Sequence, residues 1–129
     1  MSLLARVRES LRPGQKGEDL AASHLAREGL VVLARNYRCR GGELDLVVRD
    51  PDGTVAFVEV KERRTATHGR GFDAVTVGKR RRLLVAARHY ASRHGLYESP
   101  LRFDVVSVDW QGSEPQLRWD RGAFDADGR

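Results

Sequence analysis

The sequence predicts an α/β fold with a mixed β-sheet flanked by helices. Residues 16–28 and 77–94 repeat apolar side chains at helical spacing, while residues 30–38, 43–63 and 101–110 have the composition of strands. The resulting order of helix, three strands, helix and strand interleaves the two element types, which favours the α/β class. With 129 residues, the chain is long enough for one domain with a single core.

The segment KGEDLAASHLAREG predicts a helix from Lys16 to Glu28, and Gly29 directly after it is a typical helix stop. Its stripe at i, i+3, i+4 and i+7 spacing consists of Glu18, Ala21, Ala22 and Leu25. A carboxylate therefore heads the face that we expect to pack on the sheet. The alternative is that Glu18 is only a first-turn acid favoured by the helix dipole.

Residues 43–63, ELDLVVRDPDGTVAFVEVKER, predict a β-hairpin. The Pro51-Asp52-Gly53 loop suits a three-residue turn closed by a glycine at positive φ. In the register that this loop sets, Asp45 lies across from Glu59. Glu43 then lies across from Lys61. The opposite face is apolar and consists of Leu44, Leu46, Val48, Ala56, Val58 and Val60.

Two like charges facing each other destabilise a sheet, so Asp45 and Glu59 require a shared proton or a cation between them. Lys61 lies beside this pair rather than between its members. A hard divalent ion such as Mg²⁺ binds one or two carboxylates and keeps positions for water and substrate phosphates. The alternative is a solvent-exposed sheet face on which charges alternate with apolar residues.

Positive charge is concentrated in one part of the chain. The formal net charge is +5, yet residues 61–95 contain ten Lys or Arg against Glu62 and Asp73, a balance of +8 that leaves −3 for the remainder. A basic region that begins where the acidic hairpin ends is expected of a polyanion-binding surface beside a metal site. The alternative is a basic helix that is Arg-rich merely to stay solvated.

A second helix is predicted from Val77 to His94, with Thr76 as its N-cap and Gly95 as its stop. Its apolar stripe consists of Leu83, Ala86, Ala87, Tyr90 and Ala91. Lys79 is aligned with this stripe and can reach toward the sheet, whereas Arg81 and Arg88 point the opposite way.

Cations in a first turn oppose the helix dipole unless an anion such as phosphate binds there. The candidate nucleic-acid-binding residues are Lys79, Arg80, Arg81 and Arg82 in this turn, together with Arg63 and Arg64 after the hairpin.

The remaining segments complete one domain over residues 1–119. Residues 63–78 are expected to form a mobile loop beside the site, and residues 116–120 a weak last strand. Asp104 in the strand before it is interpreted as a local hydrogen-bond acceptor. Residues 120–129 are predicted to be a flexible C-terminal tail.

Several function classes are disfavoured by composition. The single cysteine, Cys39, excludes an internal disulfide and suits the cytoplasm, and no apolar run approaches membrane-spanning length. The four histidines lack the paired spacing of a zinc site, and no Ser, Cys or His stands in a convincing nucleophilic arrangement.

The order of elements, with Asp45 on one hairpin strand and Glu59-Val60-Lys61 on the other, resembles the PD-(D/E)XK nuclease superfamily, which includes restriction enzymes and Holliday-junction resolvases. The chain is more closely similar to the bacterial YraN-like family. The segments that carry this similarity are KGEDLAASHLAREG, NYRCRGGELDLVV, FVEVKER, AVTVGKRRRL and RFDVVSV. One departure from the wider superfamily is Leu44, which replaces a proline before Asp45.

The resemblance implies a restriction endonuclease-like three-layer core. It also implies that Glu18, Asp45, Glu59 and the Val60 carbonyl hold Mg²⁺ or Mn²⁺. Asp45, Glu59 and Lys61 would be the catalytic residues, with Lys61 positioning or activating the attacking water.

The function expected from the sequence is that of a metal-dependent endonuclease acting on DNA or on structured, branched nucleic acid. A homodimer would suit junction resolution, because two sites would cut opposed strands. The first alternative is a non-catalytic nucleic-acid-binding module of the same fold. The second is a small scaffold whose basic helix binds an acidic protein partner.

Overall fold

The computed structural model describes residues 15–64 and 77–124. In chain order, the elements are α2 (Gln15–Arg27), β1 (Val31–Cys39), β2 (Gly42–Arg49), β3 (Val55–Arg64), α3 (Val77–His94), β4 (Leu101–Gln111) and β5 (Glu114–Phe124). The five strands form one sheet in the order β1-β2-β3-β4-β5. Among the described strands, only β3 and β4 pair in parallel, and α3 lies between them in the chain. The predicted α/β class and mixed sheet are confirmed.

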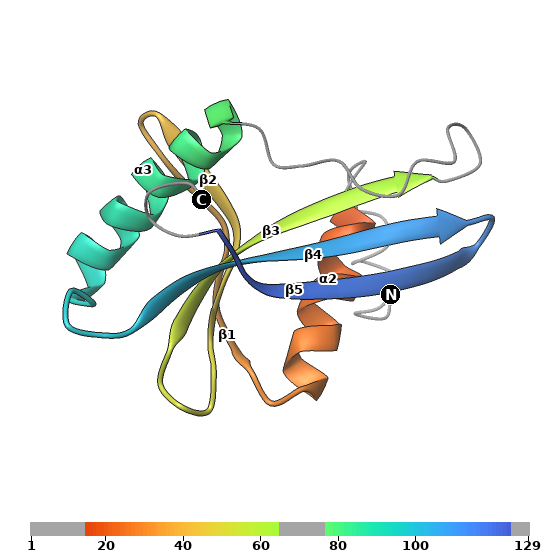
Figure 1. Cartoon of the computed structure of the whole chain (residues 1–129), viewed down its shortest axis with the longest axis horizontal. Helices are drawn as coiled ribbons and strands as arrows, with labels where there is room; N and C mark the ends of the chain where they lie inside the picture. The colour runs from red at the N-terminus through yellow and green to blue at the C-terminus, as the bar shows by residue number, and fades with distance from the viewer. Residues whose placement is uncertain (1–14, 65–76, 125–129) are drawn as a thin grey trace, which may run out of the picture.

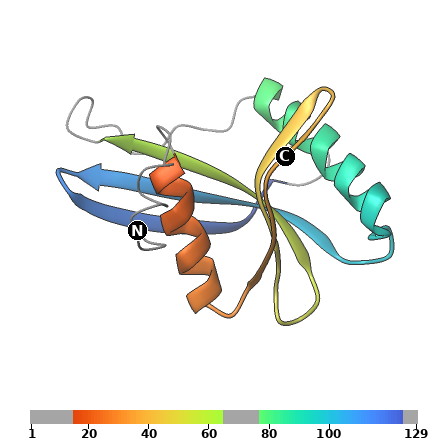
Figure 2. The same cartoon turned by 180° about the vertical axis from the view of Figure 1, so that it is seen from behind.

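The two helices cover opposite faces of the sheet (Figures 1 and 2). On one face, buried residues of α3 pack against Val47, Phe57 and Phe103. On the other, Ala21 and Leu25 of α2 pack with Leu46, Val58 and Val106. The molecule therefore has three layers, and the alternative of a sheet face left open to solvent does not apply.

The helix boundaries follow the predicted stop signals. Helix α3 runs over the predicted residues, and its buried side chains are those of the predicted stripe. Gly29 and Gly95, which follow the two helices, have φ values of 93° and 64°, which favour glycine. Thr76, the expected N-cap, lies outside the described residues. Neither described helix is long and apolar enough to cross a membrane.

The turn of the β2–β3 hairpin has the predicted geometry. Gly53 has a φ of 93°, and the Asp50 amide donates to the Thr54 carbonyl at 2.8 Å. The ladder then pairs Arg49 with Val55 and continues to Leu46 with Val58, which is the predicted register. The turn chemistry therefore aligns the two strands as expected.

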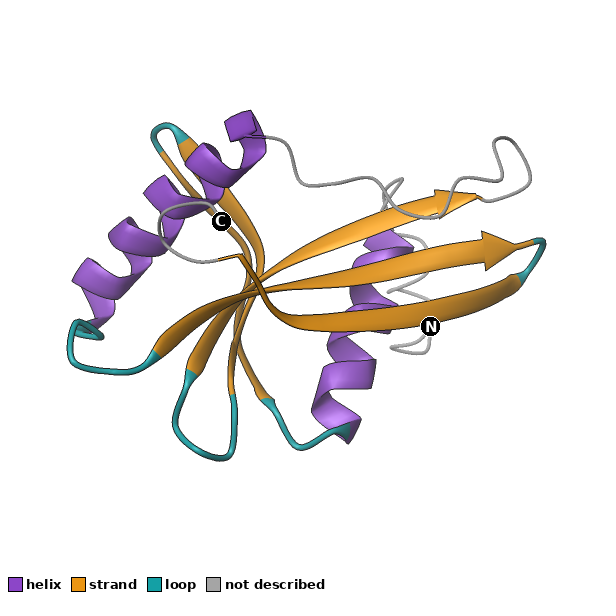
Figure 3. Ribbon diagram, viewed as in Figure 1, coloured by secondary structure: helices purple, strands orange, loops and turns teal. Residues whose placement is uncertain are grey.

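Beyond the Leu46–Val58 pair, β2 and β3 separate, and we call this point the fork. Strand β2 continues with β1, whereas β3 continues with β4 and β5 (Figure 3). Asn36 of β1 lies between the pairs that flank Asp45, and its φ of 53° interrupts the regular strand there. Strand β1 also has a bulge between Val32 and Ala34, and bulges bend a strand and increase its twist.

Two predicted positions are wrong because of the fork. Leu44 packs with Val47 and Phe57 under α3, not on the face of Leu46, because β2 twists between these positions. Glu43 does not pair with Lys61 in the ladder. Its carboxylate instead forms ion pairs with Arg38 at 3.7 Å and Arg82 at 3.6 Å.

The C-terminal part of the sheet extends further than predicted. Strand β5 reaches Phe124, whose ring stacks on Phe103 with centroids 4.9 Å apart, so the expected tail from residue 120 begins too early. Residues 125–129 lie outside the described residues. Asp104 is fully buried and accepts hydrogen bonds from Arg102, the Trp119 indole and the Gly122 amide. Its predicted role as a local acceptor is confirmed.

Helix α3 approaches β2 closely enough to require a glycine. A Cβ at Gly42 would lie 2.7 Å from the Ala86 amide nitrogen of α3. We expect Gly42→Ala to lower the free energy of unfolding by about 1–3 kcal/mol in a denaturant titration, because α3 must shift away. In the control Gly78→Ala, the added Cβ meets nothing within 4 Å, so no loss is expected. Equal stability of Gly42→Ala and the wild type would contradict this packing.

Candidate functional site

A pocket of about 550 Å³ lies at the fork and is lined by the acidic side chains predicted as ligands and by some of the predicted cations. We call it the carboxylate pocket. It is lined by Glu18, Asp45, Glu59, Val60, Lys61, Glu62, Arg63 and Lys79. Every residue predicted as a metal ligand or catalytic group is among these eight, although they come from α2, β2, β3 and α3.

Asp45 and Glu59 meet across the fork, where burial favours a proton between them. The Asp45 carboxylate accepts a hydrogen bond of 2.8 Å from the Val60 amide, and burial raises its pKa. Burial, then the charge of Asp45, raises the pKa of Glu59 to about 8. At neutral pH, Glu59 is therefore mainly protonated and donates a hydrogen bond to Asp45.

Glu18 contributes the third carboxylate from the first turn of α2. Burial and the charge of Asp45 raise its pKa, whereas Arg35 and a hydrogen bond with Asn36 oppose that rise. Its Oε1 atom is buried and has no hydrogen-bond partner among the described residues. A buried carboxylate oxygen without a partner is costly, so Glu18 is suited to receive a cation.

The position of Glu18 depends on close contact between α2 and the C-terminal ends of β3 and β4. A Cβ at Gly17 would lie 2.8 Å from the Glu62 carboxyl carbon, so the glycine allows the helix to approach. Glu62 also accepts a hydrogen bond of 2.5 Å from the Trp110 indole. The Lys16 ammonium lies 4.9 Å from the centroid of the same Trp110 ring. These contacts hold the first turn of α2 beside the fork.

The three carboxylates are the type of ligand that a hard divalent cation prefers, but their side chains are not yet arranged around a common metal position. Oxygen ligands from Glu18, Asp45 and Glu59 suit Mg²⁺ or Mn²⁺, and Val60 can add its carbonyl. In residues 15–64 and 77–124, however, no three His, Cys, Asp or Glu side chains are already arranged as a metal site. Binding an ion would require the Glu59 proton to leave and the carboxylates to turn toward one another.

The six predicted nucleic-acid-binding cations have different surroundings. Lys79 lines the carboxylate pocket, where its charge lowers the pKa of both Asp45 and Glu59. Successive helical residues diverge by about 100° around the axis. Arg80 accordingly lies over the Phe124 ring at 5.3 Å, Arg82 pairs with Glu43, and Arg81 is exposed.

The two cations after the hairpin are also engaged by the sheet. Arg63 lines the carboxylate pocket and forms an ion pair of 2.9 Å with Asp109. Arg64 donates to the Gly112 carbonyl at 3.2 Å and lies over the Trp110 ring at 5.5 Å. Of the six predicted cations, Lys79 and Arg63 are those that line this pocket.

Comparison with known proteins gives a family for this arrangement. The model of the Uncharacterised protein family UPF0102 matches residues 17–108, a range that includes every residue lining the carboxylate pocket. The chain belongs to the UPF0102 family. This confirms the YraN-like resemblance found in the sequence.

Individual UPF0102 proteins are similar over most of their length. The chain is 46% identical over 114 residues to one from Cupriavidus taiwanensis, covering 88% of this chain and 83% of that protein. It is 45% identical over 123 residues to one from Pseudomonas aeruginosa, covering 92% and 98%. The match with a UPF0102 protein of an Acidovorax species is 42% over 125 residues, covering 95% and 91%.

Two residues of the site were missed in the sequence. Asn36 contacts Glu18, and its position inside a predicted strand is the signal that could have found it, because Asn tolerates positive φ better than most residues. Glu62 lies between Lys61 and Arg63 in the basic stretch. Its role depends on Trp110, 48 positions later, which local sequence pattern does not indicate.

Proposed function

We propose that this UPF0102 protein is a metal-dependent endonuclease that hydrolyses phosphodiester bonds in DNA or in structured, branched nucleic acid. The observation that carries the proposal is the meeting of Glu18, Asp45, Glu59 and Lys61 in one pocket at the fork. Carboxylates for a divalent ion and a cation for a phosphate are the groups that metal-assisted phosphodiester hydrolysis requires.

The acidic residues of the pocket would bind the metal ion. Glu18, Asp45 and Glu59 would hold Mg²⁺ or Mn²⁺ together with the Val60 carbonyl. When bound, such an ion polarises a phosphoryl oxygen and lowers the pKa of a bound water. The Val60 amide already fixes the Asp45 carboxylate, and the unpartnered Oε1 of Glu18 supports a cation beside it.

Two lysines offer positive charge where a phosphate would enter. The charges of Lys61 and Lys79 both lower the pKa of Glu59, so both ammonium groups act on the pocket. A lysine is a compact cation suited to the charge that develops on phosphoryl oxygens. We assign Lys61 to the attacking water and the reacting phosphate, and Lys79 to a neighbouring phosphate.

A second candidate function is a non-catalytic nucleic-acid-binding module. It is favoured by the observation that the described carboxylates are not already arranged around a metal position. In that case, the shared proton between Glu59 and Asp45 would be the functional state, and the cations would still bind phosphates.

Cleavage assays on a panel of linear, branched and single-stranded substrates, with Mg²⁺ or Mn²⁺, test the enzyme proposal. We expect at least one substrate of the panel to be cleaved, and this cleavage should require the divalent ion. The matched control is the same panel in EDTA. No cleavage across the panel, together with no stabilisation of the protein by millimolar Mn²⁺, would favour the binding module.

The salt dependence of binding tests whether the cations contact phosphates. We expect replacement of Lys79, Arg80, Arg81 and Arg82 by Ala to weaken duplex binding in EDTA. It should also flatten the log–log salt slope by about 0.9 per lost phosphate contact. The single Arg81→Ala variant isolates the exposed cation, and Arg27→Ala on α2 is the control. An unchanged slope would favour the acidic protein partner considered from the sequence.

A further inference from the structure

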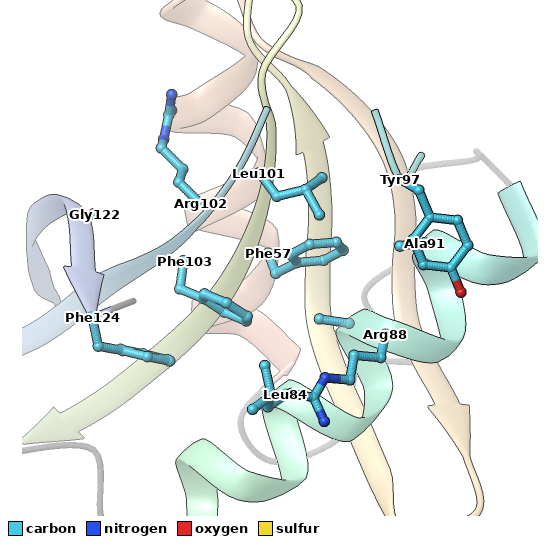
Figure 4. A pocket seen from close by; sticks show the side chains of 11 residues that line it. Phe57, Leu84, Arg88, Ala91, Tyr97, Leu101, Arg102, Phe103, Gly122 and Phe124 are labelled. Carbon is cyan, nitrogen blue, oxygen red and sulfur yellow. The ribbon is translucent and has the colours of Figure 1, made fainter. Parts of the chain in front are cut away.

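A second pocket, of about 520 Å³, lies between α3 and the sheet. We call it the aromatic pocket. Its sheet side carries Phe57, Phe103 and Phe124, while Leu84, Arg88 and Ala91 of α3 line the other side and Tyr97 follows the helix (Figure 4). A mainly apolar cavity of this size with a few polar groups at its rim is typical of a ligand site.

The aromatic rings form a connected row. The centroids of Phe57 and Phe103 are 5.6 Å apart, and those of Phe103 and Phe124 are 4.9 Å apart. These three rings are nearly fully buried, whereas Tyr97 remains 73% exposed. The cavity therefore has a wall of buried aromatic rings and one accessible ring, Tyr97, on which an unpaired base can stack.

The polar groups of the aromatic pocket favour an anionic ligand. Arg88 is exposed, lines the cavity and lies beside Leu84 on the α3 side of the rings. Arg102 also borders the cavity, but it points away from the rings and pairs with Asp50 at 2.9 Å and Asp104 at 3.0 Å. Arg88 is thus the cation placed to meet a phosphate attached to a group inside the pocket.

One face of α3 leads from the aromatic pocket toward the N-terminal end of the helix, where Lys79 of the adjacent face lines the carboxylate pocket. Arg80, Leu84, Arg88 and Ala91 follow helical spacing along this face. Arg80 lies over the Phe124 ring, and its neighbour Lys79 lines the carboxylate pocket. At about 1.5 Å per residue, Lys79 and Arg88 are roughly 13 Å apart along the helix, the length of about four stacked nucleotides.

We propose that the aromatic pocket binds an unpaired nucleobase of a strand whose phosphates follow Arg88 and Arg80 toward the fork. This inference rests on the proposed function and specifies its substrate: nucleic acid with a single-stranded segment a few nucleotides from the bound phosphate. A blunt duplex offers no such base, so it would bind through the cations alone.

The test measures binding of a short single-stranded oligonucleotide carrying one 2-aminopurine, in EDTA, so that no cleavage is needed. We expect Tyr97→Ala to weaken binding by about fivefold to a hundredfold, the usual cost of losing one base–aromatic stack. Tyr97→Phe should retain the affinity. Arg88→Ala should reduce the salt slope by about 0.7, as expected for a single strand, and Arg93→Ala on the same helix should not.

An NMR titration provides a second readout that does not depend on Tyr97. Because nucleobases shift nearby resonances through ring currents, the oligonucleotide should move the methyl signals of Ala87 and Ala91, which line the pocket. Unchanged methyl signals, or equal affinities for Tyr97→Ala and the wild type, would overturn the inference. Mononucleotide binding as tight as that of the strand would overturn it as well. Methyl shifts on dilution of the protein alone would instead assign the pocket to a second copy.

These outcomes are separate from those of the cleavage panel. If cleavage requires Mn²⁺ but Tyr97→Ala binds normally, the base pocket is wrong and the endonuclease proposal stands. If the base stacks but no substrate is cleaved, the pocket stands and the protein is a binding module.

Discussion

Asp45→Asn and Glu59→Gln should each reduce metal-dependent cleavage by about a thousandfold or more. Each substitution removes a carboxylate from the carboxylate pocket, so the ion that lowers the pKa of water is lost or misplaced. Both replacements preserve side-chain shape. The amide oxygen introduced by Asp45→Asn can still accept from the Val60 amide, and the amide group introduced by Glu59→Gln can donate to Asp45 as protonated Glu59 does. The measurement is the single-turnover rate on the best substrate of the panel.

Binding and folding controls separate lost chemistry from lost structure. In EDTA, both variants should bind nucleic acid with nearly the wild-type affinity, because the lysines that we assign to phosphates are unchanged. Lys61→Ala should lose turnover while retaining stabilisation by Mn²⁺, since Lys61 is assigned to the water and the phosphate rather than to the ion. Cleavage by either carboxylate variant at the wild-type rate would exclude the carboxylate pocket as the active site.

Local sequence signals account for much of the fold. The Pro51-Asp52-Gly53 loop has few compatible conformations, so it correctly predicted the hairpin register and the nearness of Asp45 to Glu59. The apolar period and the Gly95 stop predicted α3 to the residue. Such features depend on a few neighbouring residues, which is why they can be recognised without the tertiary structure.

The fork could not be predicted in this way. Beyond Leu46, β2 stays paired with β1 and is no longer paired with β3, and Asn36 of β1 has a positive φ at this level of the sheet. Neither feature follows from the local sequence of the hairpin. The directions of the basic side chains at the start of α3 also depend on residues distant in the sequence. Glu43 pairs with Arg82, and Arg80 lies over the Phe124 ring. Similarly, the polar residues after position 119 did not predict a strand. The strand continues there because the Phe124 ring stacks on Phe103 and the Gly122 amide donates to Asp104.

The stability of the metal-free protein should fall as pH rises from about 5 to 8. The folded-state pKa of Glu59 is about 8, above its ordinary value of 4.5, so over this range the folded protein binds a proton that the unfolded chain releases. The stability linked to Glu59 is therefore fully present below about pH 4.5 and is lost as pH rises through about 8. At about 1.4 kcal/mol per pKa unit, the free energy of unfolding should drop by up to about 4 kcal/mol.

Urea titrations across this pH range, for the wild type and Glu59→Gln, measure the effect. The variant cannot ionise at position 59, so its curve should be flatter and should lie above that of the wild type at pH 8. A pH dependence identical to that of the wild type would show that Glu59 does not hold the proton.

Adding Mn²⁺ extends the same experiment to the metal. Below pH 8, an ion must displace the Glu59 proton before this carboxylate can bind it, so Mn²⁺ should stabilise the wild type more at pH 8 than at pH 6. Glu59→Gln should lose most of this stabilisation at both pH values, because it lacks the ligand. Equal stabilisation of the wild type and the variant would place the ion elsewhere. No stabilisation of the wild type even at pH 8 would leave a carboxylate pocket that holds a proton rather than a metal, which is the state expected of the non-catalytic binding module.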